Sequence, residues 1–104
     1  MDYSENYSEK YMHATSVFKA MAHPLRVAIL NLLKNCDELT VTQIHDHLNI
    51  PQAIASHHLN LLKSSGVLCS KKEGKTVRYS LKNPLLGQVL DCIETCNCSE
   101  NETL

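Results

Sequence analysis

Residues 40–66 read TVTQIHDHLNIPQAIASHHLNLLKSSG, and this stretch decides the fold. Thr40, followed three residues later by Gln43, forms a capping box, which predicts that a helix begins there. Asn49 can adopt the left-handed conformation that ends a helix, and Pro51 suits the first turn of a new one. Gly66 closes this second helix as a C-cap. The stretch is therefore predicted to form a helix-turn-helix.

The second of these predicted helices has two faces of different composition. Ala55, Leu59 and Leu62 recur on one stripe and are expected to lie in the core. The opposite face carries small or hydrogen-bonding side chains and one cation, namely Gln52, Ala53, Ser56, His57, Asn60 and Lys63. Such side chains can enter the major groove of DNA and read base edges. An ordinary solvated helix face has a similar composition, so this helix alone does not decide between the two interpretations.

The residues that follow predict a two-stranded hairpin. Residues 67–81, here called the wing, have strand-forming residues on both sides of Glu73-Gly74, which is a turn signal. We expect the cations of the wing to contact DNA phosphates; they are Lys71, Lys72, Lys75 and Arg78. The alternative is that they solubilise an exposed edge hairpin. A basic hairpin directly after a helix-turn-helix favours DNA contact and predicts a winged helix-turn-helix.

The net charge of -1 conceals an uneven distribution of charge. Residues 50–82 hold six cations and one acid, whereas residues 83–104 hold four acids and no cation. A positive strip on an otherwise acidic body favours an oriented contact with double-stranded DNA. The length of 104 residues predicts one domain that spans residues 1–104.

No apolar run is long enough to cross a membrane, and residues 1–6 lack the features of a secretory signal. We therefore expect a cytoplasmic protein with no membrane partner. The five cysteines are then expected to be thiols, metal ligands or redox switches and not a disulfide framework. No glycine-rich phosphate loop or recognisable cysteine–histidine motif occurs, so we do not expect an enzyme.

Both ends of the chain predict dimerisation helices, within residues 1–22 and 84–98. The first carries apolar side chains at the spacing of a helix–helix seam: Tyr7, Tyr11, Ala14, Phe18 and Met21. The second presents one apolar stripe, made of Leu86, Val89, Leu90 and Ile93. A small domain with such stripes is expected to bury them against a second copy. A homodimer of this kind would place two recognition helices about one DNA turn apart and read a near-palindromic operator.

The whole chain is thus expected to be mainly α-helical with a small β-hairpin. The predicted order is four helices, two strands and a fifth helix, with one of the helices over residues 24–34. Residues 99–104 are expected to form a disordered tail. No cofactor is expected to be required for folding.

Three motifs resemble those of the ArsR/SmtB family of dimeric winged helix-turn-helix repressors. They are FKAMAHPLRVAIL at residues 18–30, SHHL at residues 56–59 and RYSL at residues 78–81. The resemblance covers roughly residues 14–92. It implies a homodimer that blocks transcription until a metal ion, a metalloid or a thiol oxidant weakens its hold on the operator. Pro51 stands where the family usually has a serine, so the hydroxyl contacts of that serine are lost.

The best-known sensor sites of the family are not carried over to this chain. The family's arsenic and cadmium site uses cysteines in a short sequence motif, and the corresponding residues 38–42 of this chain read ELTVT. Its zinc and cobalt site begins with an Asp and a His, where this chain has Asn83 and Leu85. Both ligand sets are therefore missing.

Three other cysteines gather near the C-terminus, at Cys92, Cys96 and Cys98. Three thiolates suit a soft ion such as As(III), Cd(II) or Pb(II). Alternatively, Cys92 and Cys96 pack at the dimer seam as small hydrophobic residues. In a third interpretation, Cys36, which follows the predicted helix at 24–34, forms a redox switch with Cys92 or Cys96.

These observations predict a sequence-specific DNA-binding transcriptional regulator, a repressor released from its operator by a thiophilic metal or metalloid bound at the C-terminal cysteines. One alternative is a thiol-redox or persulfide-responsive repressor of the same fold. An alternative of another class is a winged-helix protein-interaction module that does not bind DNA. A steep dependence of DNA binding on salt distinguishes a regulator from such a module.

Overall fold

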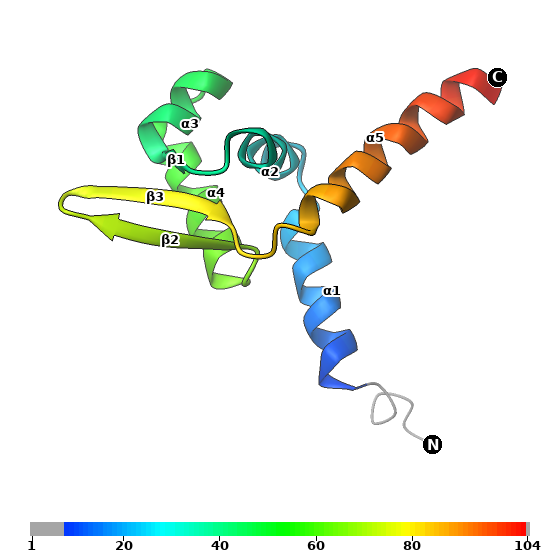
Figure 1. The fold of residues 1–104 in the computed structure, drawn as a ribbon, viewed down its shortest axis with the longest axis horizontal. Helices are drawn as coiled ribbons and strands as arrows, with labels where there is room; N and C mark the ends of the chain where they lie inside the picture. Colours follow the sequence, from blue (N-terminus) through cyan, green and yellow to red (C-terminus); the bar gives the residue numbers. More distant parts are fainter. Residues whose placement is uncertain (1–7, 104) are drawn as a thin grey trace.

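The computed structural model describes the backbone of residues 8–103 and the side chains of residues 8–95. The order of elements is α1 (Glu9–Met21), α2 (Pro24–Cys36), β1 (Leu39–Thr40), α3 (Val41–Leu48), α4 (Gln52–Ser64), β2 (Leu68–Glu73), β3 (Thr76–Leu81) and α5 (Leu86–Thr103). This order is that of a winged helix-turn-helix, as predicted (Figure 1). No helix in the described part of the chain is long and apolar enough to cross a membrane.

The core lies between α2, α3, α4 and the inner face of the sheet. Ala55, Leu59 and Leu62 of α4 are completely buried, which confirms the stripe predicted for this helix. Aliphatic side chains from the other elements complete the cluster, among them Ile29, Leu30, Leu33, Ile44, Leu68 and Leu90. α4 is therefore fixed to the body by one face, and its other face is left open to solvent.

The helix-turn-helix has the predicted local geometry at Thr40, Gln43 and Asn49, but not at Pro51. The backbone N–H of Gln43 donates to Thr40 Oγ1 over 3.2 Å, and the backbone N–H of Thr40 donates to the side-chain Oε1 of Gln43 over 2.9 Å. Asn49 is left-handed, with φ 55° and ψ 50°. Pro51 differs from the prediction, because it is the N-cap of α4 and not part of its first turn. Its ψ of 144° is extended, and its carbonyl accepts the first hydrogen bond of the helix from Ile54.

Gly66 ends α4 in a Schellman motif. The C-cap itself is Ser65, and Gly66 follows it with φ +80°, a conformation that costs glycine little. The Gly66 amide donates to the Lys63 carbonyl, and the Val67 amide donates to the Leu62 carbonyl over 2.9 Å. The chain is thereby turned from α4 directly into the wing.

The wing is a hairpin of β2 and β3 whose turn lies one residue later than predicted. Glu73 still pairs with Thr76, so the two turn residues are Gly74 and Lys75, and Gly74 has φ +61°. A third strand, β1, pairs with β3 and gives the sheet order β1-β3-β2, whereas the sequence predicts two strands. A strand of only two residues has no periodicity from which it could be predicted.

The two terminal helices project from the side of the body opposite the wing (Figure 1). The radius of gyration of 15.8 Å exceeds the value of about 13 Å for a compact domain of this length. α2 runs two residues further than predicted and includes Cys36. α5 begins at Leu86, after a turn in which Asn83 Oδ1 accepts from the Leu85 amide. It continues to Thr103, so residues 99–103 are helical where a disordered tail is expected.

Candidate nucleic-acid interface

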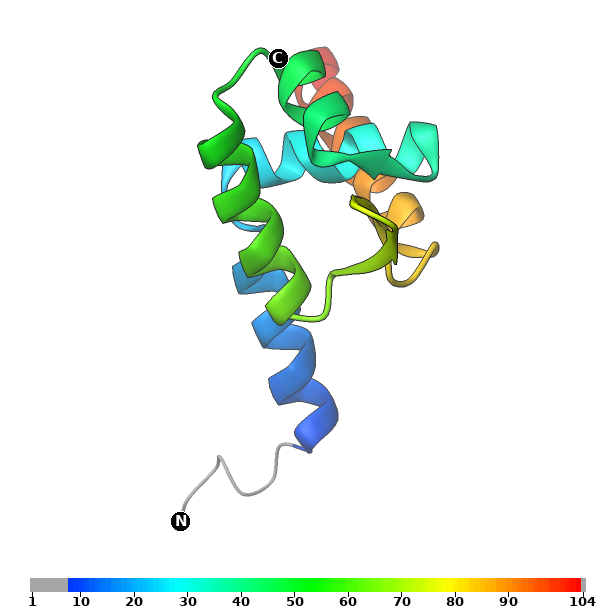
Figure 2. The same cartoon turned by 90° about the vertical axis from the view of Figure 1, so that its left-hand side faces the viewer.

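The face of α4 that points away from the core carries the residues predicted to contact DNA. Gln52, Ala53, His57, Asn60 and Lys63 are exposed, and Ser56 is half-buried. Viewed along the hairpin toward the body, α4 lies beside the wing and no other helix or strand passes in front of it (Figure 2). Small and polar side chains thus occupy a helix face that no other described element covers.

A groove of about 400 Å³ joins this face to the wing and to the start of α3. Its walls are Thr40, Val41, Thr42, Gln52, Ser56, Lys75, Thr76, Val77 and Tyr79. Two residues predicted to read bases, Gln52 and Ser56, therefore line the same groove as Lys75, which is predicted to contact phosphate. The capping box places α3 here, since Thr40 and Thr42 stand at the start of that helix.

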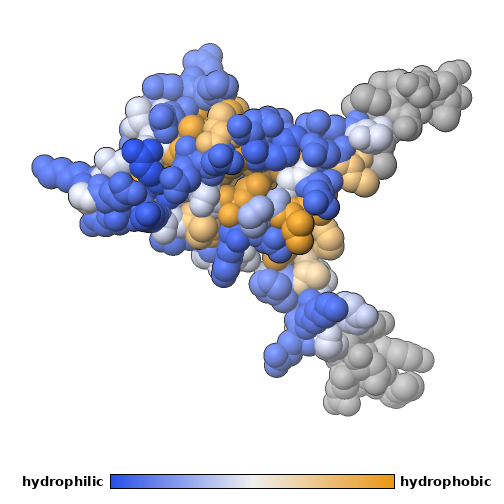
Figure 3. All heavy atoms as spheres, viewed as in Figure 1, coloured by the Kyte–Doolittle hydropathy of each residue, from blue (hydrophilic) through white to orange (hydrophobic). Residues whose placement is uncertain are grey.

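The remaining wing cations lie on both faces of the hairpin. Lys71 is opposite Arg78 and Lys72 is opposite Val77 in the antiparallel register. Because side chains alternate along a strand, Lys71 and Arg78 share the face that carries the Cys69–Ser80 contact, and Lys72 lies on the other. The hydrophilic surface of the hairpin is visible in Figure 3.

Lys71 and Arg78 are like charges directly across two strands, an arrangement that destabilises a hairpin. Glu73 lies 3.8 Å from the Lys71 ammonium, but both side chains are more than half exposed, so this ion pair contributes little. A phosphate between the two cations would relieve their repulsion. The register therefore favours an anionic partner on this face of the wing.

One exposed side chain near this surface was missed by the sequence analysis. Ile54, in the first turn of α4, is 43% exposed. The sequence could have indicated this exposure, because Ile54 falls outside the core stripe of Ala55, Leu59 and Leu62. The N-terminal residues of a recognition helix are those that reach base edges, and an apolar side chain there can contact a thymine methyl group.

His58, next to the exposed His57, is buried in α4 with 8% of its surface exposed. Its Nδ1 accepts a hydrogen bond of 3.1 Å from Arg26 Nε, and Arg26 Nη1 donates to the Ala20 carbonyl over 3.0 Å. The ring of His23 lies 4.7 Å from that of His58. Burial lowers the pKa of His58, and the neighbouring His23, Arg26 and His57 lower it further.

The cysteines are placed by the structure only in part. Cys36, Cys69 and Cys92 are exposed free thiols. The side chains of Cys96 and Cys98 lie outside the described residues, so the three-cysteine site is not tested. Among the side chains that the structure describes, no three His, Cys, Asp or Glu residues come together as a metal site.

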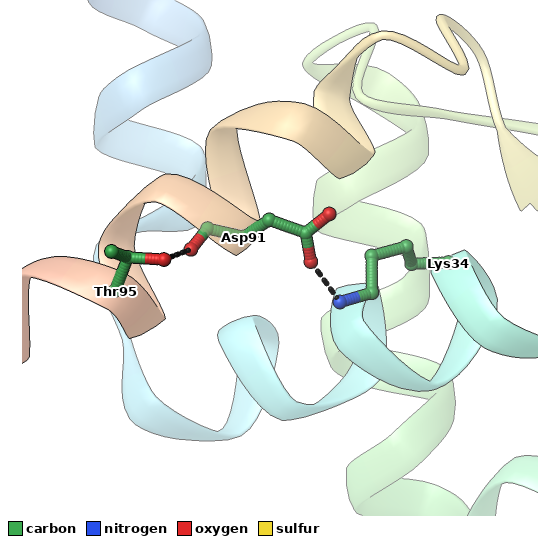
Figure 4. Close-up of polar contacts among 3 residues, drawn as sticks. All are labelled: Lys34, Asp91 and Thr95. Atoms are coloured by element: carbon green, nitrogen blue, oxygen red, sulfur yellow. Dashed lines mark hydrogen bonds and ion pairs between the residues drawn. The ribbon is translucent and has the colours of Figure 1, made fainter. Parts of the chain in front are cut away.

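An ion pair fixes α5 beside α2 at the residue before Cys92. Lys34 Nζ donates to Asp91 Oδ1 over 2.5 Å, and Thr95 Oγ1 donates to the Asp91 carbonyl (Figure 4). The hydrogen bond that Lys34 donates to Asp91 raises the pKa of Lys34. A Cβ atom at Gly87 would come within 3.1 Å of Lys34 Cγ, so the glycine allows the lysine stem to lie against α5.

The apolar stripes of the terminal helices divide between the core and the surface. Met21, predicted at the dimer seam, is only 6% exposed and lies in the core, because the last turn of α1 docks on the body. Leu90 is also buried, whereas Phe18 is 62% and Ile93 52% exposed. Ala14 is half-buried, Tyr11 and Val89 are exposed, and Tyr7 lies outside the described residues. Part of each helix therefore offers apolar surface to another molecule.

Comparison with known proteins places this architecture in a family. The family described as "Bacterial regulatory protein, arsR family" matches residues 23–69. The chain is also 36% identical over 86 residues to an uncharacterized HTH-type transcriptional regulator, MJ1325, of Methanocaldococcus jannaschii. That alignment covers 83% of this chain and 97% of the relative. The chain belongs to the arsR family of regulatory proteins. The resemblance noted in the sequence is thereby confirmed.

A further relative is a cadmium resistance transcriptional regulatory protein, the CadC homolog of Staphylococcus aureus. It is 39% identical over 80 residues, which cover 77% of this chain and 66% of the relative. Among solved structures, the transcriptional repressor PagR of Bacillus anthracis has a TM-score of 0.76 at 32% identity, with 82% of this chain and 97% of PagR covered. The homodimeric winged helix-turn-helix domain of Mb0332 from Mycobacterium bovis has a TM-score of 0.75 at 25% identity, with 86% of this chain and 82% of that domain covered.

Proposed function

We propose that the chain is a DNA-binding transcriptional repressor in which α4 contacts the bases of the operator and the wing contacts its phosphates. The observation that carries the proposal is the groove in which Gln52 and Ser56 of α4 meet Lys75 of the wing. Base-reading and phosphate-binding side chains have to act on one stretch of duplex, and the groove brings both kinds together. The repressor PagR, with the same fold, supports this assignment. Because the target is DNA, we place the protein in the cytoplasm.

The active form is proposed to be a homodimer joined through α1 and α5. Support comes from the exposed apolar side chains of the two projecting helices, such as Phe18, Leu85 and Ile93. A groove of about 250 Å³ lies between the two helices and is lined by Val17, Leu86 and Val89 among others. The Mb0332 domain, a homodimer, supports the same assembly. Two copies related by a two-fold axis would read a near-palindromic operator.

The effector is proposed to be a thiophilic metal or metalloid bound by Cys92, Cys96 and Cys98. The relation to a cadmium resistance regulator supports a metal effector, and soft ions such as As(III), Cd(II) and Pb(II) suit thiolates. Cys92 is exposed, and Cys96 follows one helical turn later on α5. The alternative is an oxidant or persulfide that joins the exposed Cys36 to Cys92 or Cys96.

Measuring the affinity for operator DNA over a range of salt concentrations tests the DNA-binding proposal. The operator is first selected from random duplexes with the full chain. We expect the logarithm of the association constant to fall linearly with the logarithm of salt concentration, with a slope of several units. A protein-interaction module would show no such slope, and that result would refute DNA recognition.

Titrating the reduced complex with arsenite, cadmium, lead, zinc or a persulfide donor tests the effector. We expect the thiophilic ions to release the parent protein, whereas Cys92→Ser and Cys96→Ser stay bound to DNA. Cys36→Ser is the matched control and should respond normally. If Cys36 is required instead, and mass spectrometry finds a disulfide or polysulfide, the effector is an oxidant. If none of these variants alters release, the cysteines are not the sensor.

A further inference from the structure

A path of two hydrogen bonds joins the recognition helix to the end of α1. One guanidinium, that of Arg26 in α2, donates from Nε to His58 Nδ1 and from Nη1 to the Ala20 carbonyl. Ala20 lies in the last turn of α1, where carbonyls lack partners within the helix and attract a cation. Arg26 therefore caps α1 and holds α4 at the same time. Among the described residues, His58 is the single buried polar side chain.

The hydrogen bond to His58 requires that this residue be neutral. An imidazole nitrogen accepts only while it is unprotonated, so the neutral ring carries its proton on Nε2. Protonation of Nδ1 would remove the acceptor and place a second positive charge against the Arg26 guanidinium. The other titratable groups facing His58 are His23, from the start of α2 at 4.7 Å, and His57, from α4 itself at 5.3 Å. Each of them adds to the repulsion once it is charged.

We propose that Arg26 and neutral His58 are positioning residues that hold α4 in its DNA-reading orientation, and that protonation of His58 releases α4 and weakens operator binding. The proposal rests on the DNA-binding function proposed above. It assigns a pH response to a buried histidine and a half-buried arginine outside the proposed DNA contact, since His58 is buried while His57 next to it is exposed. Because the same guanidinium also caps α1, the response would involve the helix that we assign to dimerisation.

The direction of the effect follows from the lowered pKa of His58. The folded protein prefers the neutral ring more than the unfolded chain does, so it holds fewer protons below the ordinary histidine pKa of about 6.5. Stability from this site is complete above that pH and declines as the pH falls from it toward the folded pKa. Below the folded pKa, operator affinity should fall by up to about tenfold per pH unit, the limit for one proton.

Two neighbouring histidines have to be removed to isolate this effect. His57 is exposed on the DNA face, so its protonation would strengthen phosphate binding and oppose the loss. His23 accepts from the Leu25 amide through Nδ1 and its ring lies 4.7 Å from that of His58, so it is replaced as well. The reference protein is therefore the double variant His23→Asn with His57→Gln. Asparagine is a good N-cap and does not titrate.

The test compares operator affinity between about pH 8 and pH 5 at constant salt, in the reference protein and in the same protein with His58→Asn. The Oδ1 atom of asparagine replaces Nδ1 as an acceptor for Arg26 but cannot be protonated in this range. We expect the affinity of the reference to fall at least fivefold while the His58→Asn protein changes less than twofold. Binding to unrelated DNA corrects for general charge effects, and circular dichroism and sedimentation confirm fold and dimer at each pH.

A second variant and a second readout keep the test decisive if His58→Asn does not fold. Arg26→Lys keeps the positive charge, but its single ammonium group replaces a guanidinium that donates from both Nε and Nη1. This variant should bind the operator more weakly at pH 8, and its affinity should depend less on pH. By linkage, operator DNA should lower the His58 pKa that NMR measures in the reference protein. Equal pH profiles with and without His58, or a His58 pKa that DNA leaves unchanged, would overturn the proposal. Absence of operator binding by the parent protein at pH 8 would instead overturn the proposed function, and this inference with it.

Discussion

Replacing Lys71 with Gln should weaken DNA binding while leaving the fold intact. Lys71 lies opposite Arg78, so its removal relieves a repulsion of about 0.2 to 1 kcal/mol between neighbouring strands. It also removes the contact with Glu73, which is exposed and worth at most a similar amount. The two terms oppose each other, and the free energy of unfolding should change by no more than about 0.5 kcal/mol.

The effect on DNA binding should be much larger. Each lost phosphate contact lowers the slope of log affinity against log salt by about 0.9. If the curves of variant and parent meet near 1 M salt, this slope corresponds to about an eightfold loss of affinity at 0.1 M. The proposed homodimer has two wings, so the slope should fall by about 1.8 and the affinity at 0.1 M by about sixtyfold.

Fluorescence anisotropy with labelled operator at four or more salt concentrations gives the slope, and urea unfolding gives the stability. Lys10→Gln is the matched control, because it removes the same charge from an exposed position on α1, away from the wing. Its slope should stay close to that of the parent. An unchanged slope for Lys71→Gln would refute the phosphate contact, and an equal loss for Lys10→Gln would show that only net charge matters.

Three further changes test the recognition helix and the elements that hold it. Gln52→Ala should cost about 1 to 3 kcal/mol of discrimination among operator variants, measured by competition binding, whereas uniform weakening would argue against base reading. Leu59→Ala, at a completely buried site, should lower the free energy of unfolding by about 2 to 5 kcal/mol in urea, and a loss below 1 kcal/mol would contradict the packing of α4. Gly66→Ala should lower the free energy of unfolding by about 1 to 2 kcal/mol, because the residue has φ +80°. The new methyl group would lie 3.7 Å from His13, an ordinary contact, so the loss comes from the backbone. Unchanged stability in urea would contradict the left-handed turn.

The sequence predicts those parts of the structure that local chemistry determines. The capping box at Thr40 and Gln43, the left-handed Asn49 and the buried stripe of α4 each depend on residues within a turn or two of one another. The strand β1 was missed because its two residues are defined only by pairing with β3. Met21 was placed at the wrong surface because helical spacing does not say whether an apolar side chain meets its own core or a second chain.

The candidate site divides in the same way. The exposed face of α4 could be predicted because burial of Ala55, Leu59 and Leu62 determines which side chains point outward. The hydrogen bond between Arg26 and His58 could not, since 32 residues separate its partners and no local pattern links them. The opposition of Lys71 and Arg78 also depends on the strand register, and this register follows from a turn that lies one residue later than predicted.

α2 contacts both terminal helices and the recognition helix α4. Near its start, Arg26 bonds both to the end of α1 and to His58 of α4, and near its end, Lys34 bonds to Asp91 of α5. An effector bound beside Asp91 at Cys92 would act on α5, and the Lys34 ion pair offers a route from α5 to α2. A coupling of about 1 to 3 kcal/mol changes affinity by about five- to 150-fold. Because the Asp91 side chain is 63% exposed, water screens the ion pair, and that coupling has to be carried mainly by the buried packing of Leu90 against the core.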